Sequence, residues 1–307
     1  MAERLTKRQR REETQAKLAA MRAAQARKER RAKVLSAVAA VVAVLLVVGV
    51  FVVVKLTSNG TKAHSAASGV ASTSVVQGVT QVPVATYDAV GAGSVQSVPT
   101  AMKGAAAITA GGKPRVLYVG AEYCPFCAAE RWAMAAALSR FGTFTNLGTT
   151  SSSATDTDPN TATLSFHGST YASDKISFTG YETTTNQQKS DGSYPPLDKV
   201  PAADQALLDK YDAPPYVDAS SKGSIPFVDI GGKYLISGAS YDPAVLKGKT
   251  HEQIAAAMLD PGSAIAKAVL GTANVITAAI CQVTGNTPTN VCTSPGVQAG
   301  LAKLTSG

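Results

Sequence analysis

The sequence predicts an α/β protein, because strand-like and helix-like segments alternate along the chain. Residues 116–120 form an apolar, partly β-branched run typical of a buried strand, and an alanine-rich stretch of good helix formers follows at 128–140. Residues 162–167 and 176–181 alternate with a period of two, which favours strands. Residues 203–211 carry the spacing of a short amphipathic helix. This alternation of elements is typical of α/β domains.

Two cysteines lie between the first of these strands and its helix. The order strand, CxxC, helix places Cys124 at a helix N-terminus, where unpaired N–H groups and the helix dipole favour a thiolate. Pro125 falls in the first helical turn, where its missing N–H costs nothing. Neither Pro125 nor Phe126 brings an imidazole or a charge, so we expect the helix N-terminus alone to stabilise the thiolate. The spacing indicates thiol–disulfide exchange, in which Cys124 attacks and Cys127 resolves the mixed disulfide.

The run AEYCPFC, from Ala121 to Cys127, resembles the active-site turn of the thioredoxin superfamily. The longer run 120–132 is similar to a family of membrane-anchored thioredoxin-like proteins of unassigned function found in actinobacteria and archaea, and this resemblance covers roughly residue 80 to the end. It implies a thioredoxin-like fold in which Pro226 follows a cis peptide bond and lies opposite the CxxC. The predicted substrate contacts are Ile225, Pro226, Pro125 and Phe126.

Cys124 and Pro226 are far apart in the chain, so the predicted fold carries an insertion at about 148–222. The C-terminal part, 260–307, is expected to contain a packed helix and a tail held by a structural disulfide between Cys281 and Cys292. A relay of electrons from this second pair to the first is the alternative.

A metal site is the competing interpretation of the CxxC. Zinc would need a second cysteine pair or histidines nearby, and His167 is the only histidine in the central part of the sequence. We therefore expect no metal and no cofactor, and we interpret His167 as a structural or surface residue.

Other side chains near the CxxC have simpler roles in this prediction. Trp132 is expected in the core, and Glu122 and Glu130 are expected to be solvated charges. For Glu130, the alternative is a proton acceptor for Cys127. Residues 75–87 are rich in β-branched side chains and predict an N-terminal strand or extended segment.

The net charge of +8 belongs to the N-terminal tail. Residues 1–33 hold twelve Lys and Arg and four Glu, and the remaining chain is balanced, which gives no support to nucleic-acid binding. Residues 34–54 are uncharged and long enough to cross the ~30 Å of a bilayer. By the positive-inside rule, 1–33 is a basic cytoplasmic tail, 34–54 a transmembrane helix in contact with the lipid bilayer, 55–75 a flexible linker and 76–307 an extracytoplasmic domain. A cleaved signal peptide is the alternative, but the length of the apolar run and of the tail argues against it.

These observations predict a membrane-anchored extracytoplasmic thiol–disulfide oxidoreductase. Its partners would be protein thiols and disulfides of secreted or envelope proteins, together with a membrane redox partner. Oxidase or isomerase activity is favoured over reductase activity, because disulfides persist outside the cytoplasm. The alternatives are a non-catalytic binding or scaffold protein with an inert disulfide, and a thiol-based carrier of a metal such as copper(I).

Overall fold

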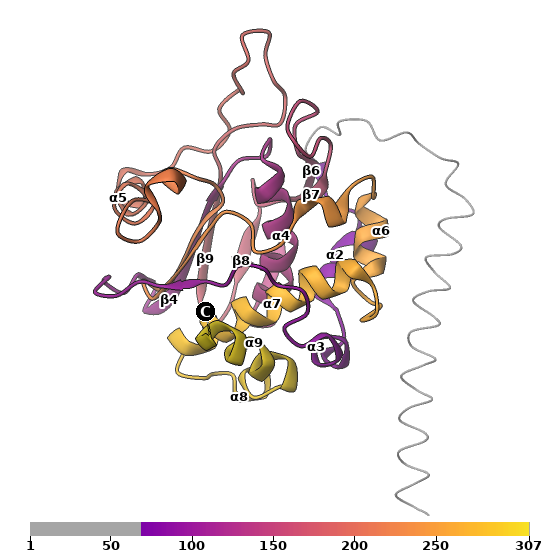
Figure 1. Cartoon of the computed structure of the whole chain (residues 1–307), viewed down its shortest axis with the longest axis vertical. Coiled ribbons are helices and arrows are strands. Elements are labelled where there is room, and N and C mark those ends of the chain that lie inside the picture. Colours follow the sequence, from indigo (N-terminus) through magenta and orange to yellow (C-terminus); the bar gives the residue numbers. More distant parts are fainter. Residues whose placement is uncertain (1–68, 307) are drawn as a thin grey trace, which may run out of the picture. The chain divides into compact units, whose positions relative to one another are not determined.

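The computed structural model describes residues 69–306 (Figure 1). The predicted tail 1–33, the predicted membrane helix 34–54 and most of the predicted linker lie outside the described residues, so the topology remains a prediction. Within the described part, the helix Ala264–Val283 is long and apolar enough to cross a membrane. Nearly all of this helix is buried among the other elements, which is typical of a core helix.

The main sheet is centred on β4 (Lys113–Gly120). Its neighbours are β9 (Ser177–Glu182), which runs parallel to it, and β10 (Phe227–Ile230), which runs antiparallel. Further out, β11 (Tyr234–Ser237) pairs with β10, and the short β2 (Thr100–Ala101) pairs with β11. The short β3 (Thr109–Ala110) pairs with the start of β4. An α/β fold class is thus confirmed.

Both faces of this sheet are covered, which explains why β4 reads as a continuous apolar run. On one face lie α4 (Pro125–Leu138) and α7 (Ala264–Val283), with α9 (Pro295–Ser306) packed on α7. On the other face, α5 (Ala202–Tyr211) and the loop after it cover a second, smaller apolar cluster. Figure 1 shows α5 on one side of β4 and β9, and α4 and α7 on the other. The predicted helix 203–211 is confirmed by α5.

The range 148–222 is not one separate inserted unit. Its last strand, β9, belongs to the main sheet. Its first strands, β6 (Gly148–Ser151) and β7 (Ala162–Ser165), form a small antiparallel sheet with β1 (Gly69–Val70). Its other strand, β8 (Thr170–Ala172), forms a two-stranded sheet with β5 (Thr143–Thr145), which lies just before this range.

The predicted N-terminal strand at 75–87 is wrong, and the structure has two helices there. They are α2 (Thr73–Thr80) and α3 (Val84–Val90). Val75 and Val79 are four residues apart, so both fall on the buried side of α2, and tertiary packing overrides their β-propensity. The folded part therefore begins before residue 76, and the predicted linker ends earlier than 75. The other helical segments are α6 (His251–Ala257), α8 (Thr289–Cys292) and the 3₁₀ turns η1 (Ala219–Ser221) and η2 (Pro243–Leu246).

The predicted disulfide between Cys281 and Cys292 is present and buried. It ties the end of α7 to α8, close to the turn between β10 and β11, where Gly231 packs against Val283. The N–H of Gly231 donates to the carbonyl of Arg115, near the start of β4. Cys124 follows the opposite end of β4, on the order of 15–20 Å away at about 3.3 Å per residue. The two cysteine pairs are therefore too far apart for direct thiol–disulfide exchange.

Candidate active site

Cys124 is the N-cap of α4, as the sequence predicts. β4 ends at Gly120, a three-residue turn follows, and Pro125 occupies the first helical position. The Sγ of Cys124 accepts a hydrogen bond from the backbone N–H of Cys127 at 3.2 Å. A sulfur atom thus takes the place that a serine or aspartate oxygen usually has at a helix start.

Cys124 is less accessible than a freely exposed nucleophile. Only 4% of the residue is exposed, and Cys127 is fully buried. The Cys124 thiol lies against the loop before β10 and donates to the carbonyl oxygen of Ile225 at 3.7 Å. The carbonyl of Ile225 therefore borders the sulfur of Cys124.

The two thiols differ in acidity. The hydrogen bond from the Cys127 thiol lowers the pKa of Cys124, helped by the Cys127 N–H and the charge of Arg131, although burial opposes the shift. Burial raises the pKa of Cys127 well above its usual value, and the hydrogen bond and charge of Cys124 raise it further. Of the two thiols, Cys124 therefore ionises more readily, and Cys127 holds its proton more strongly. Both cysteines are free thiols in the structure.

The peptide bond between Ile225 and Pro226 is cis, as expected. Phe227, which follows, pairs with Val119 of β4, so the cis bond lies next to the end of the strand that carries the CxxC. Phe126 is 44% exposed beside Cys124, whereas Pro125 is buried. Among the predicted substrate contacts, Phe126 therefore has the largest free surface near the thiol.

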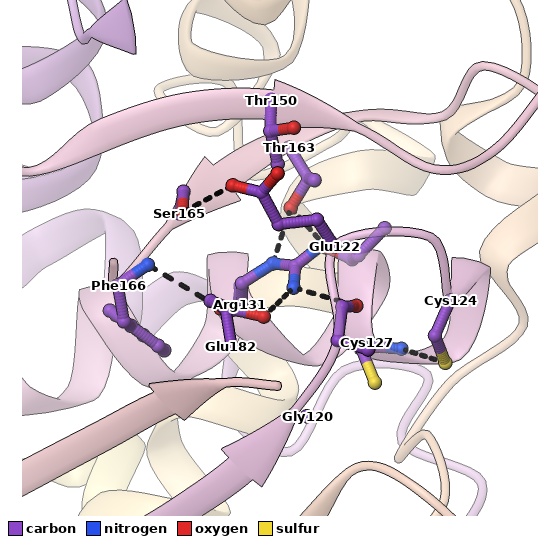
Figure 2. A network of polar contacts seen from close by, with 12 residues as sticks. Gly120, Glu122, Cys124, Cys127, Arg131, Thr150, Thr163, Ser165, Phe166 and Glu182 are labelled. Carbon is purple, nitrogen blue, oxygen red and sulfur yellow. Dashed lines mark hydrogen bonds and ion pairs between the residues drawn. The ribbon is translucent and has the colours of Figure 1, made fainter. Parts of the chain in front are cut away.

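Beneath the cysteines lies a buried ion network centred on Arg131 (Figure 2). Arg131 and Glu182 are both fully buried, and Nη1 of Arg131 lies 2.7 Å from Oε2 of Glu182. The same nitrogen donates to the carbonyl of Ala121 and to the hydroxyl of Tyr118, and Nε donates to Thr163. The network thereby joins the end of β9, the turn before Cys124 and the helix after Cys127.

Two carboxylates face this guanidinium. Burial raises the pKa of Glu182 to about 7, although Arg131 pulls it down. Glu122, in the turn before Cys124, is also fully buried and accepts a hydrogen bond from Ser165 at 2.8 Å. Burial opposes the charge of Arg131 too, but the charges of Glu182 and its other neighbours outweigh this and raise the pKa of Arg131. The guanidinium therefore stays charged.

Gly120 lets this network approach the thiol of Cys127. A Cβ at this position would overlap the hydroxyl of Tyr118 and lie 3.1 Å from Sγ of Cys127. The tyrosine hydroxyl and the cysteine sulfur thus border the space that a side chain would fill. A glycine is required at the end of β4.

The expectation that Glu122 and Glu130 are solvated is wrong. Glu130 is fully buried and accepts two hydrogen bonds from Ser240, from its N–H at 2.9 Å and from its hydroxyl at 3.1 Å. Burial raises the pKa of Glu130 to about 7. Trp132 is in the core, as predicted, and its indole N–H donates to Ala162.

The loops on one side of Cys124 form an aromatic and polar wall. Tyr123 stacks on Tyr194 with ring centroids 4.3 Å apart. The hydroxyl of Thr155 lies within hydrogen-bonding distance of both Tyr194 and Gln188, and the N–H of Ser153 donates to the carbonyl of Tyr123. Two segments between α4 and β10 thus contact Tyr123, the residue directly before Cys124.

Sequence reasoning missed Arg131 and Glu182. A signal for Arg131 exists: it lies four residues after Cys127, and therefore on the same face of the helix, in an otherwise alanine-rich run. Glu182 gives no such signal, because only the pairing of β9 with β4 brings it near. His167 is a surface residue paired with Asp198, as expected. Within residues 69–306, no group of three or more His, Cys, Asp or Glu side chains could hold a metal ion.

Comparison with known proteins gives one match. A family described as "Domain of unknown function (DUF929)" matches residues 100–282, which is more than half of the chain and includes β4, the CxxC helix, Pro226 and all of α7 but its last residue. No curated protein and no solved structure matches the chain. The chain belongs to this domain family of unknown function.

Proposed function

We propose that this chain is a membrane-anchored, extracytoplasmic thiol–disulfide oxidoreductase with a thioredoxin-like fold and additional segments between α4 and β10. One observation carries the proposal. The Sγ of Cys124 sits between the N–H of Cys127 at 3.2 Å and the carbonyl of Ile225 at 3.7 Å, with the second thiol of the pair buried one helical turn away. This geometry supports a low-pKa attacking thiolate with a resolving thiol behind it.

The chemistry follows from the two acidities. The Cys124 thiolate attacks one sulfur of a substrate disulfide, which forms a mixed disulfide and releases the other substrate sulfur as a thiolate. Cys127 then loses its proton and attacks Cys124, which forms the Cys124–Cys127 disulfide and releases the second substrate thiolate. The substrate gains two electrons and the cysteine pair loses two. An oxidase runs the same steps in reverse and needs a membrane oxidant to regenerate the disulfide.

The Arg131 network supports this role. Its positive charge lowers the pKa of both cysteines, while burial holds Cys127 in its protonated form. Ionisation is thus concentrated on the sulfur that faces Ile225. For a merely structural cysteine pair, a buried guanidinium and two buried carboxylates beneath it would be a cost without a use.

The test is the reduction potential of Cys124–Cys127 in the full-length protein, read by alkylation across a glutathione redox series. A value near or above about −180 mV fits an oxidase or isomerase, and one near −270 mV fits a reductase. If the pair stays oxidised and unalkylated until the protein unfolds, the proposal fails, and a binding or scaffold protein is the better interpretation.

A further inference from the structure

A polar cavity lies on the α5 side of the main sheet, close to the loop that holds Pro226. Its volume is about 310 Å³, at the lower end of the range for ligand pockets. Hydroxyl groups and one carboxylate dominate its lining, which includes Ser97, Thr100, Tyr216, Asp218, Ser221 and Ser237. This size and polarity suit a single long polar side chain better than a cofactor.

The walls of the cavity adjoin the residues that face Cys124. One wall, residues 215–221, comes directly before the Ile225–Pro226 loop, and the N–H of Ser224 donates back to the carbonyl of Ser221. The opposite wall contains Ser237, which pairs with Phe227, the residue after Pro226. Paired strand residues are about 4.5–5.5 Å apart. An extended chain that passes Ile225 therefore reaches the cavity within about three or four residues, at ~3.3 Å each.

The cavity lies where the pairing of β11 with β2 ends, and Ser97 and Val98 line it together with Ser237. β2 pairs with β11 through Ala101–Tyr234 and Thr100–Leu235. Before Thr100 the chain turns away, and the N–H of Ser97 donates instead to the carbonyl of Ser240 at 3.2 Å. The end of β11 at Ser237 thus borders the cavity, and an extended polypeptide can lie beside such a strand end.

The charged groups at the cavity are carboxylates. Asp218 lines it, and Asp212 lies behind it and accepts a hydrogen bond from the Ser237 hydroxyl at 3.4 Å. Burial raises the pKa of Asp212 to about 6, and only the Ser237 hydrogen bond opposes this shift. Among residues 69–306, no lysine or arginine lines the cavity. Two carboxylates without a cation favour a ligand that brings one.

We propose that this cavity is a subsite for a lysine or arginine side chain of the polypeptide substrate, carried about three or four residues from the cysteine that reacts with Cys124. The inference rests on the proposed oxidoreductase function and adds a substrate class: extended segments with a basic residue near the cysteine. The ammonium or guanidinium group binds Asp218 and the hydroxyl of Ser237, and the alkyl part passes the strand end.

The test compares peptides of equal length, each with one cysteine in a disulfide with a small thiol. Three peptides carry Lys, Gln or Glu, respectively, at three or four residues from the cysteine. A fourth peptide carries its Lys ten residues from the cysteine. With the reduced full-length protein, the Lys peptide should react about two- to five-fold faster than the Gln peptide, as expected for an ion pair with the exposed Asp218. In the double variant Asp212→Asn/Asp218→Asn, the Lys peptide should react no faster than the Gln peptide. The preference for Lys should persist in Glu252→Gln, which removes one exposed charge from α6.

Asparagine at 212 keeps an oxygen acceptor for Ser237, and Asp218→Asn alone serves if the double variant does not fold. The subsite is refuted if the variants keep the preference, or if the distant Lys works equally well, because long-range attraction then explains the effect. Reaction with the small disulfide of glutathione separates the two proposals. If it proceeds without any peptide preference, only the subsite fails; if Cys124 is inert to every disulfide, the oxidoreductase itself fails.

Discussion

Replacing Arg131 by methionine would leave the carboxylate of Glu182 buried without its counter-charge. Both side chains are fully buried and their charged atoms are 2.7 Å apart. Removal of one partner from such a pair typically costs about 3–5 kcal/mol, since the other charge remains buried. Arg131→Met and Glu182→Gln should each fall in this range. The double variant buries neither charge, so it should be about 2–3 kcal/mol more stable than the two losses added together.

The assay is urea unfolding followed by fluorescence, with the free energy of unfolding from linear extrapolation. The chain contains one tryptophan, Trp132, and it is buried on α4 directly beside Arg131 in sequence, so its signal reports this part of the fold. Additive losses in the double variant would refute the view that Arg131 and Glu182 act as a pair.

A second measurement separates stability from chemistry. The charge of Arg131 lowers the pKa of Cys124, so Arg131→Met should raise that pKa and slow the alkylation of Cys124 at neutral pH. Arg140→Met is the matched control. Arg140 follows the far end of α4, where it binds Asn274 and Ser294 and covers the ring of Tyr87. Its loss should destabilise the protein and leave Cys124 alkylation unchanged; equal slowing in both variants would contradict a direct effect of Arg131.

Three further predictions concern single features. Burial raises the pKa of Glu130 from 4.5 to about 7, so between these pH values the folded state binds more protons than the unfolded state, and the free energy of unfolding falls as the pH rises. Glu130→Gln should flatten this pH dependence in urea titrations at pH 5 to 8. An unchanged slope would show that other groups cause the dependence. Gly120→Ala places a methyl 3.1 Å from Sγ of Cys127 and closer still to a buried tyrosine hydroxyl, so it should cost at least ~1–3 kcal/mol of stability in the same assay. Replacing Cys281 and Cys292 by serine opens a loop of sequence separation 11 and should cost about 2–3 kcal/mol, while Cys124 reacts with alkylating reagents at its normal rate; a slower reaction would contradict the separation of the two cysteine pairs.

The parts of the fold that follow from local pattern were predictable from sequence. The α/β class, the CxxC at the start of a helix and the helix at 203–211 depend on periodicity and on capping within a few residues. The strand predicted at 75–87 failed for a physical reason. Its valines also satisfy a helical spacing of four, and their burial against other helices decided between the two periods.

The buried charges were not predictable, because their environment comes from distant segments. Glu130 looks like an exposed charge in an alanine-rich helix, but Ser240, more than a hundred residues later, closes over it. Glu182 reaches the site only through the parallel pairing of β9 with β4. Only Arg131 shares a local relation with the motif, four residues after Cys127.

This difference bears on how the reactivity of Cys124 is set. The motif CPFC suggests that the helix N-terminus alone stabilises the thiolate, and the N–H of Cys127 does contribute. Arg131 adds a full positive charge from beneath, and that charge is held in place by Glu182 on β9 and by the carbonyl of Ala121 in the turn. The acidity of Cys124 is thus a property of the assembled sheet and helix. Two chains with the same CPFC motif will therefore differ in the pKa of the first cysteine if they differ at the position of Arg131 or at that of its partner, Glu182.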